Sequence, residues 1–117
     1  MNLSEFNEKT YQPQREYPVK PEIICNDGFK MSAQGSQRHY SNPQSNSRLY
    51  SSMEIGYPSE KVEEFMEYAE DKDKPTDTVY GYVPSGIIQK VIEKHGGINY
   101  KLTSAGIVPM GYTVHAY

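Results

Sequence analysis

One stretch decides the fold: residues 77–97, which read DTVYGYVPSGIIQKVIEKHGG. The first part alternates β-branched and aromatic residues with small or polar ones, and it ends at Pro84. This pattern predicts a strand over 77–83, with Tyr80 and Tyr82 on one of its faces. After Pro84, apolar residues recur at helical spacing until a Gly-Gly pair stops them, which predicts a helix capped by Ser85. Its apolar stripe consists of Ile87, Ile88, Val91 and Ile92.

A second amphipathic helix is predicted over residues 59–71. Apolar residues follow one another at i, i+3, i+4 and i+7, and Ser59 stands at the position of a cap. The helix lies in the segment 54–77, which holds nine acids and three lysines and has a net charge of −6. We interpret these acids as a solvated face, and the alternative is a surface that mimics nucleic acid. The apolar stripe consists of Val62, Phe65, Met66 and Ala69.

Several strands are predicted around these helices. Asn26-Asp27-Gly28 is a strong turn signal between short apolar runs, so residues 22–33 should form a hairpin. Residues 48–57 alternate loosely, with Leu49, Met53 and Ile55 able to share a face, and predict a third strand. Residues 98–103 and 112–117 are predicted to be two terminal strands that pair with each other.

The predicted order of elements is β-β-β-α-β-α-β-β, which favours the α+β class. We expect a single small domain over residues 22–117, a mostly antiparallel sheet with two helices on one face. Residues 1–21 contain Pro13, Pro18 and Pro21 and show no apolar periodicity. We therefore expect them to form an extended or disordered arm without a helix.

Composition excludes several classes of protein. The 117 residues carry a net charge of −3 without a basic stripe, which argues against nucleic acid as a partner. No apolar run approaches the ~20 residues of a membrane span, and the N-terminus does not resemble a secretory signal. Cys25 is the single cysteine, which fits a reducing cytoplasm. Eleven Tyr against three Phe and no Trp indicate an extended contact surface, because tyrosine is enriched at binding surfaces.

The polar stretch 35–47, GSQRHYSNPQSNS, should form a loop of about a dozen residues. Arginine can hold a phosphate, Gln and Asn can read polar edges, and Tyr and His can stack on a base. With their neighbours, these groups predict a pocket for a small anionic ligand such as a nucleotide. The alternatives are a solvated loop and, for Tyr80, a place in the core. The candidate ligand-binding residues are Gln34, Arg38, His39, Tyr40, Asn42, Arg48, Tyr80 and Tyr82.

Catalytic, cofactor-binding and metal-binding motifs are not found in the sequence. His95 stands at a predicted helix end, where an imidazolium interacts favourably with the helix dipole, and we prefer this interpretation to a catalytic acid. His39 and His115 with Lys101 would suit phosphodiester chemistry, but their spacing carries no signature. We therefore expect a protein without enzymatic activity, cofactor or metal.

Four short runs resemble small proteins encoded by tailed bacteriophages and prophages, whose role is not assigned. The runs are MSAQG at 31–35 with His39-Tyr40 and Pro43, MEIGYPS at 53–59, TDTVYGYVP at 76–84 and HGG at 95–97. The resemblance covers about residues 31–97, and no catalytic residue comes with it. It implies a small protein in the cytoplasm of an infected bacterium, where such proteins often counter host defence.

The sequence supports three hypotheses of function. The first is a non-enzymatic phage protein, expected to be a homo-oligomer, that counters host defence by sequestering a small anionic ligand such as a signal nucleotide. The second is a protein–protein inhibitor that covers a host defence enzyme with the acidic helix 59–71 and the arm 1–21. The third is a small nucleotide phosphodiesterase that uses His39 or His115. Membranes and sequence-specific nucleic acid are not expected as partners.

Overall fold

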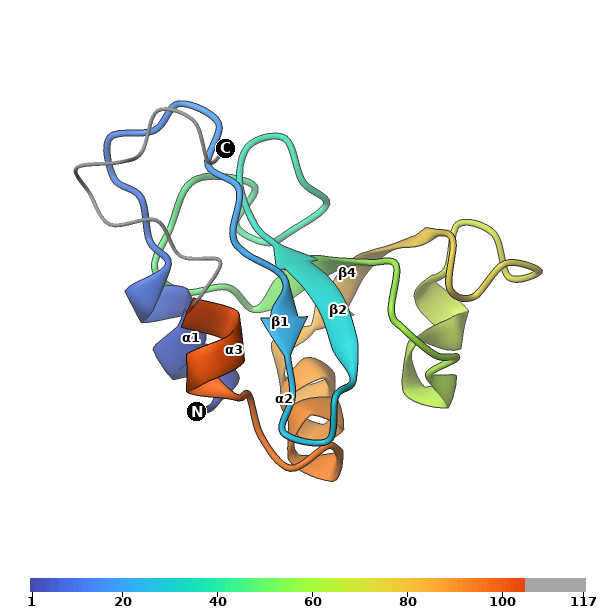
Figure 1. Cartoon of the computed structure of the whole chain (residues 1–117). Coiled ribbons are helices and arrows are strands. Elements are labelled where there is room, and N and C mark those ends of the chain that lie inside the picture. The colour runs from blue at the N-terminus through green and yellow to red at the C-terminus, as the bar shows by residue number, and fades with distance from the viewer. Residues whose placement is uncertain (105–117) are drawn as a thin grey trace.

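A computed structural model gives the fold and describes residues 1–104 (Figure 1). Four strands form one antiparallel sheet in the order β1-β2-β3-β4, which confirms the predicted α+β class and its antiparallel sheet. The predicted strand 112–117 lies outside the described residues. In chain order the elements are α1 (Leu3–Lys9), β1 (Ile23–Ile24), β2 (Lys30–Gln34), β3 (Ser52–Gly56), the 3₁₀ helix η1 (Glu63–Tyr68), β4 (Val79–Pro84), α2 (Ser85–Lys94) and α3 (Tyr100–Ser104).

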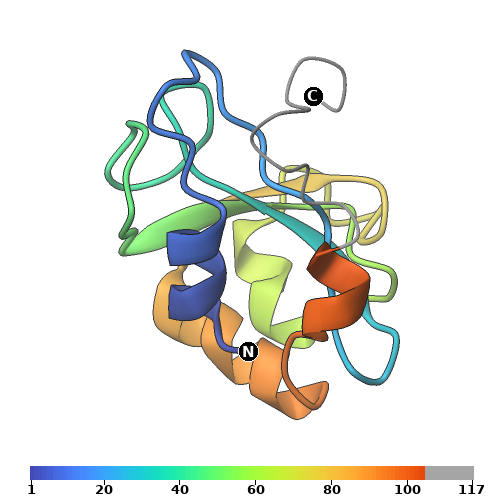
Figure 2. The ribbon, with the colours of Figure 1, turned by 60° about the vertical axis from the view of Figure 1, so that its left-hand side comes forward.

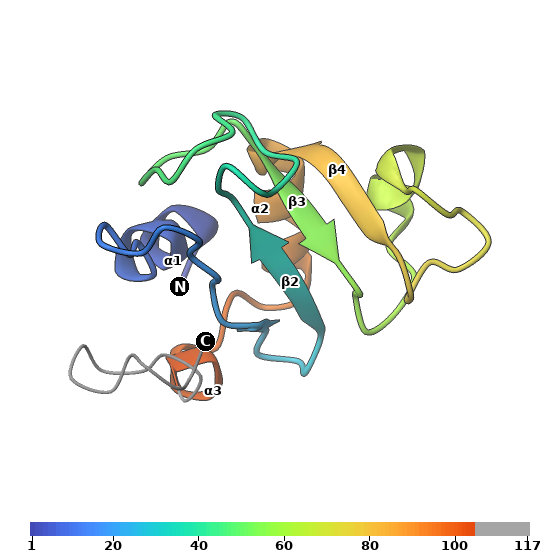
Figure 3. The ribbon, with the colours of Figure 1, turned by 90° about the horizontal axis from the view of Figure 1, so that it is seen from above.

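The helices gather on one side of the sheet, as Figure 2 shows. Alternate side chains of the strands point into this layer because successive residues of a strand face opposite sides. They meet the buried stripe of α2 and the ring of Phe65 from η1. Figure 3 shows β2, β3 and β4 side by side across the helices. The strand side chains buried there are Ile23, Met31, Ala33, Met53, Ile55, Tyr80 and Val83.

The predicted hairpin and the helix after β4 are confirmed. In the hairpin turn, Gly28 has a φ of 96°, a left-handed conformation that glycine adopts without strain. In α2, Ile88, Val91 and Ile92 are buried, and Ile87 packs against the core. Ser85 does not cap this helix, because Pro84 occupies the N-cap position. The Ser85 hydroxyl instead donates to the carbonyl of Tyr50 at 2.6 Å.

The prediction that residues 1–21 form an arm without a helix is wrong. Asn2 and Glu5 make a capping box that starts α1, and Leu3 and Phe6 are buried in the core. The prolines begin only at position 13, so they do not disturb this short helix. The chain between α1 and β1 is also tied down, since the Gln34 amide pairs with both backbone groups of Lys20 at 2.8 and 2.9 Å.

The predicted helix 59–71 is shorter and of another type. Only the six residues of η1 are helical, as a 3₁₀ helix without a side-chain cap, so Ser59 does not cap it. Ala69 ends the helix because its extended backbone forms a bridge with Tyr80 of β4. The apolar stripe still faces the core: Val62 and Phe65 are buried, while Met66 and Ala69 are partly buried against it.

The predicted strand 98–103 is also wrong. Ile98 makes one bridge with Cys25, and the chain then turns into α3. The Asn99 side chain accepts from the Leu102 backbone N–H at 3.0 Å, as an N-cap does. The Thr103 hydroxyl exchanges hydrogen bonds with both backbone groups of Ile24 at 3.1 and 3.2 Å. A helix therefore covers the free edge of β1, where the pattern predicted a strand.

Candidate functional site

Tyr80 and Tyr82 do not share a face, contrary to the prediction. Met53 pairs with Val83 and Ile55 pairs with Tyr80, so one residue of β3 stands opposite two residues of β4. Such a β-bulge breaks the alternation of side chains along a strand. Tyr80 consequently points into the core beside Phe65, with ring centroids 5.9 Å apart, whereas Tyr82 lies exposed.

Tyr82 is held on the surface by a strained backbone and by Tyr40. Its φ is +54°, in the left-handed region that a bulky side chain rarely occupies. Its N–H donates to the carbonyl of Tyr40 at 2.9 Å, and the two rings lie 5.8 Å apart. Gly81, the residue before Tyr82, has no side chain, and a Cβ there would lie 3.3 Å from the Cβ of Tyr40. The bulge and the glycine together place two exposed rings side by side.

A second contact between exposed side chains lies two residues earlier on the loop that carries Tyr40. The guanidinium carbon of Arg38 lies 3.9 Å from the ring centroid of Tyr17, a stacked cation–π contact. The neighbouring Gln37 amide donates to the carbonyl of Glu16, which joins the loop to the segment before β1. We call Tyr17, Arg38, Tyr40 and Tyr82 the aromatic patch. All four residues are exposed.

The loop that carries Arg38 and Tyr40 is built on buried hydrogen bonds. The Tyr50 hydroxyl accepts from the Ser47 N–H at 2.9 Å and lies within 2.9 Å of the Gly35 and Ser45 carbonyl oxygens. The ring of Tyr50 also fills the space beside Gly35, where a Cβ would approach it to 2.5 Å. The loop is therefore fixed at both of its ends by one side chain.

Ser36 and His39 lie in contact but do not form a catalytic pair. The Ser36 hydroxyl lies 2.6 Å from His39 Nδ1 and also accepts from the Arg38 N–H at 3.0 Å. Ser36 is fully buried, so its oxygen cannot reach a substrate. Burial lowers the pKa of His39, although the charge of Glu54 acts in the opposite direction. A largely neutral imidazole at this place steadies the turn and does not supply a cation for a phosphate.

Three other predicted site residues are engaged elsewhere. Gln34 is buried, with its amide paired to Lys20 and Ser32. Arg48 forms an ion pair with Glu8 of α1 at 2.6 Å and stacks on the ring of Tyr11. Tyr80 is buried, and its hydroxyl donates to the carbonyl of Pro75. These side chains do not join Arg38 and Tyr40 in a common pocket.

Asn42 contributes to the fold through its backbone. Its N–H donates to the Ser52 carbonyl at 3.0 Å, and its own carbonyl accepts from Ser51 at 2.8 Å. The bridge joins the loop to the start of β3. The exposed Asn42 side chain is left at the loop surface. Of the eight predicted ligand-binding residues, the structure brings Tyr40 and Tyr82 into contact, and Arg38 is exposed on the same loop as Tyr40, with the half-buried His39 between them in the sequence.

Tyr17 is a functional candidate that the sequence did not point out, whereas Tyr57 lies outside the aromatic patch. Tyr17 lies in the segment predicted to be an arm, and only its stacking on Arg38 brings it to the patch. Tyr57 follows β3 and is exposed with a φ of +48°. Among residues 1–104, Tyr57 and Tyr82 are the two non-glycine residues with a positive φ, and both are exposed. A β-rich pattern gives no signal of such a conformation.

His95 stands at the end of α2, as the sequence indicated, and fastens the hairpin turn. Its ring stacks on Phe29 with centroids 4.1 Å apart and an angle of 8°. Its Nδ1 lies 2.6 Å from a carboxylate oxygen of Asp27. The pKa of Asp27 is lowered, mainly by the Phe29 N–H that donates to its carboxylate and then by His95. These contacts are structural ones between α2 and the turn at residues 26–28.

The part of the chain that the structure describes contains no group of His, Cys, Asp and Glu side chains placed to hold a metal. Within the same residues, no helix is long and apolar enough to cross a lipid bilayer. Comparison with protein-family models, curated proteins and solved structures gave no match for this chain. The resemblance to phage proteins therefore stays a prediction.

Proposed function

We propose that this chain is a non-enzymatic binding protein that engages a protein partner through the aromatic patch. The observation that carries the proposal is the pair of exposed rings, Tyr40 and Tyr82, which the strained backbone of Tyr82 holds 5.8 Å apart. A left-handed φ at a bulky residue is unfavourable, and such strain collects at functional sites. Holding Tyr82 against Tyr40 contributes nothing to the core, so a role at the surface accounts for it best.

The chemistry of the patch suits a protein surface. Tyrosine and arginine are among the residue types that most often dominate the binding energy of protein interfaces. Here both residue types pack against a neighbouring side chain, since Arg38 lies over the ring of Tyr17 and the tilted rings of Tyr40 and Tyr82 lie 5.8 Å apart. Rigid side chains lose little conformational entropy when a partner binds. In the phage context that the resemblance implies, the partner would be a host defence protein, and the chain would be its inhibitor.

A small anionic ligand is the second candidate for the same surface. Arg38 has no carboxylate partner among residues 1–104, so its guanidinium is available to a phosphate. Tyr40 and Tyr82 would then stack on a base. The nucleotide pocket predicted from the sequence also included Gln34, Arg48 and Tyr80, but these three side chains are engaged elsewhere and would not contact such a ligand.

Two glycine variants test the proposal. Tyr82→Gly removes one ring of the patch and relieves the backbone strain, so the fold should be kept. Tyr57→Gly is the matched control, since it makes the same change at an exposed tyrosine with a similar φ outside the patch. Immobilised wild-type and Tyr57→Gly proteins are expected to retain the same protein from a bacterial lysate, and Tyr82→Gly to lose it. Retention by all three proteins, or by none, would overturn the proposal.

Nucleotides separate the two candidates. Thermal unfolding of the wild type is followed with a panel of linear and cyclic nucleotides. If a nucleotide raises the Tm of the wild type and Arg38→Ala abolishes this increase, the ligand of the patch is anionic and the protein-partner proposal is wrong. An unchanged Tm with every nucleotide supports the protein partner. Sedimentation of the same proteins gives the oligomeric state. A homo-oligomer that Tyr82→Gly dissociates would identify the partner as a second copy of this chain.

A further inference from the structure

The turn that carries Arg38 and Tyr40 depends on one histidine. The Ser36 hydroxyl is fully buried and lies 2.6 Å from Nδ1 of His39, which is half-buried. The same hydroxyl oxygen accepts from the Arg38 N–H at 3.0 Å. Among residues 1–104, these two groups are the hydrogen-bond partners of the hydroxyl. The ring of His39 is thus connected, through Ser36, to the backbone of a residue of the aromatic patch.

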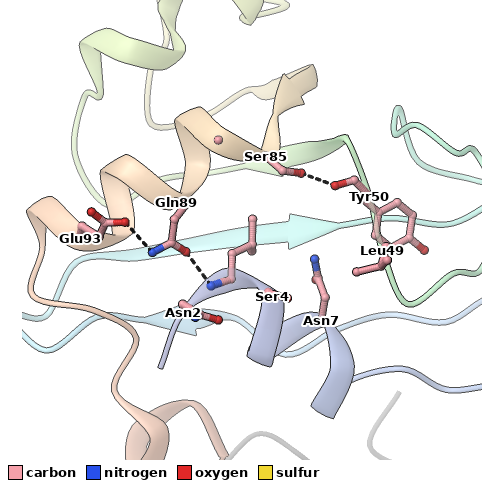
Figure 4. Close-up of a pocket in the computed structure, with 10 residues that line it drawn as sticks. Asn2, Ser4, Asn7, Leu49, Tyr50, Ser85, Gln89 and Glu93 are labelled. Atoms are coloured by element: carbon pink, nitrogen blue, oxygen red, sulfur yellow. Dashed lines mark hydrogen bonds between the residues drawn. The ribbon is translucent and has the colours of Figure 1, made fainter.

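The base of this loop is fixed independently of His39. The Tyr50 hydroxyl lies within 2.9 Å of the carbonyl oxygens of Gly35 and Ser45. Figure 4 shows that Tyr50 is held in turn by Ser85 of α2, whose hydroxyl donates to the Tyr50 carbonyl at 2.6 Å. Both loop ends are therefore tied to a helix of the core. A change at His39 acts on the turn at residues 36–40 and leaves this base in place.

The charge of the His39 ring decides whether the Ser36 hydroxyl is satisfied. A hydroxyl has one proton to donate, and His39 Nδ1 is the acceptor within its reach among residues 1–104. A neutral ring with its proton on Nε2 accepts this hydrogen bond. A charged ring carries a proton on Nδ1 as well, so it can only donate. The buried hydroxyl then lacks an acceptor, which is unfavourable.

Protonation of His39 reaches the patch by a second route, through Glu54 of β3. One carboxylate oxygen of Glu54 accepts from the Tyr40 N–H at 3.3 Å. Burial lowers the pKa of His39 from its ordinary value of 6.5, the charge of Glu54 raises it, and the charge of Lys20 lowers it. The ring is therefore largely neutral at pH 7 and becomes charged in mild acid. The charged ring attracts Glu54 and competes with the Tyr40 N–H for its carboxylate.

We propose that the Ser36–His39 pair makes the aromatic patch sensitive to pH. The neutral imidazole holds the turn that presents Arg38 and Tyr40, and the imidazolium releases it. Tyr82 follows the turn, since its N–H donates to the Tyr40 carbonyl. This inference rests on the proposed function of the patch and adds its regulation, because partner binding then weakens in mild acid.

An NMR titration of the protein alone from pH 8 to pH 5 tests the switch. At pH 8, the ring ¹⁵N shifts of His39 should report an Nδ1 without a proton. As the pH falls, the amide signals of Arg38, Tyr40 and Tyr82 should shift with the same midpoint as the His39 ring. Ser36→Ala should raise this midpoint by up to about one pH unit, because the hydroxyl stabilises only the neutral ring. An unchanged or lowered midpoint in Ser36→Ala would contradict the proposal.

His39→Asn and His95→Asn form a matched pair of variants. The asparagine side chain offers an amide oxygen near the place of Nδ1 and does not titrate, so in His39→Asn the patch signals should stay in place between pH 8 and pH 5. His95→Asn makes the same change at a histidine that contacts Asp27, so its patch signals should titrate as in the wild type. The proposal fails if the patch signals still titrate in His39→Asn, or if they do not follow the His39 ring in the wild type.

Capture from one bacterial lysate at pH 7.5 and at pH 5 tests the consequence for the partner. Titration of the partner itself affects both immobilised proteins equally, so the ratio of capture by His39→Asn to capture by the wild type isolates His39. For the protein that Tyr82→Gly loses, this ratio should rise at least about fivefold at the lower pH, the lower end of the coupling between linked sites. A constant ratio would refute the regulation and leave the proposed function intact. Equal capture by the wild type and Tyr82→Gly would refute the proposed function, and the NMR titration would still decide the switch.

Discussion

Lys20 provides the most quantitative prediction, because it is a buried cation without a counter-charge. Its side chain is 6% exposed, and among residues 1–104 no carboxylate pairs with it. The ammonium donates to the Thr10 hydroxyl at 2.8 Å and lies about 6 Å from the rings of Phe6 and Tyr50. Burial lowers the pKa of Lys20 from 10.5 to about 8. The folded state therefore releases this proton more readily than the unfolded chain.

The sign of the pH dependence follows from this difference. Between pH 8 and pH 10.5 the unfolded chain binds more protons at Lys20 than the folded protein, so this residue makes the free energy of unfolding rise with pH. A difference of 10.5 to 8 corresponds to about 3 kcal/mol over the whole titration, of which about 1 kcal/mol appears between pH 7 and pH 9. Lys20→Met removes the charge but keeps the apolar stem of the side chain. The variant should therefore be more stable than the wild type near pH 7, and its free energy of unfolding should lack the rise with pH that Lys20 causes.

Urea unfolding of the wild type and Lys20→Met from pH 7 to pH 10 measures the effect. Burial also raises the pKa of Cys25 to about 11, which lowers stability above about pH 9, when the unfolded thiol ionises. Both proteins contain Cys25, so the difference between their curves isolates Lys20. Lys30→Met, which removes an exposed lysine of β2, is the matched control and should follow the wild type. A wild-type minus Lys20→Met difference that stays constant with pH would refute the reasoning.

Four further substitutions test individual contacts by urea unfolding. Tyr50→Phe leaves the Ser47 N–H without its acceptor and should lower the free energy of unfolding by roughly 1–3 kcal/mol, and an unchanged value would contradict the loop anchor. Gly35→Ala places a Cβ 2.5 Å from the Tyr50 ring and should cost about 1–3 kcal/mol, so a neutral effect would show that the ring moves freely. Tyr82→Gly relieves the left-handed backbone and should raise stability by up to about 1 kcal/mol, whereas a Tyr82→Ala variant equally stabilised would rule out backbone strain. Asn7→Leu replaces a buried amide whose Oδ1 has no hydrogen-bond partner among residues 1–104 and should stabilise the protein by about 1 kcal/mol, and a clear loss of stability would show that the amide is satisfied.

Local patterns predicted the elements that depend on local contacts. The turn at Gly28 and the helix α2 are confirmed, because turn residues and a 3.6-residue apolar period act within a few residues of each other. The helix α1 was not predicted, although Asn2 and Glu5 form a local capping box. The prolines at positions 13, 18 and 21 favour an extended backbone only for themselves and the residues before them, so the first ten residues are free to form a helix.

Other elements were decided by partners distant in the sequence. Residues 98–103 have the composition of a strand, yet Asn99 and Thr103 hydrogen-bond to Ile24 and the segment becomes a helix. Ala69 ends η1 because it bridges to Tyr80. In both cases tertiary hydrogen bonds outweigh local propensity, whose differences between residues are below about 1 kcal/mol.

By itself the sequence determined the class of the fold and the apolar faces of α2 and η1 that enter the core, but the predicted strand 48–57 is shorter and leaves Leu49 exposed. The excess of tyrosine predicts contact with other molecules. The sequence also placed Arg38 and Tyr40 on one polar loop. Only the tertiary structure decided that Tyr80 is core while Tyr82 is surface, since one extra residue in β4 reverses the alternation. The joining of Tyr17 to the patch and the unpartnered amide of Asn7 likewise arise where separate segments meet. Such features depend on register and packing between distant residues, and a pattern along the chain does not encode them residue by residue.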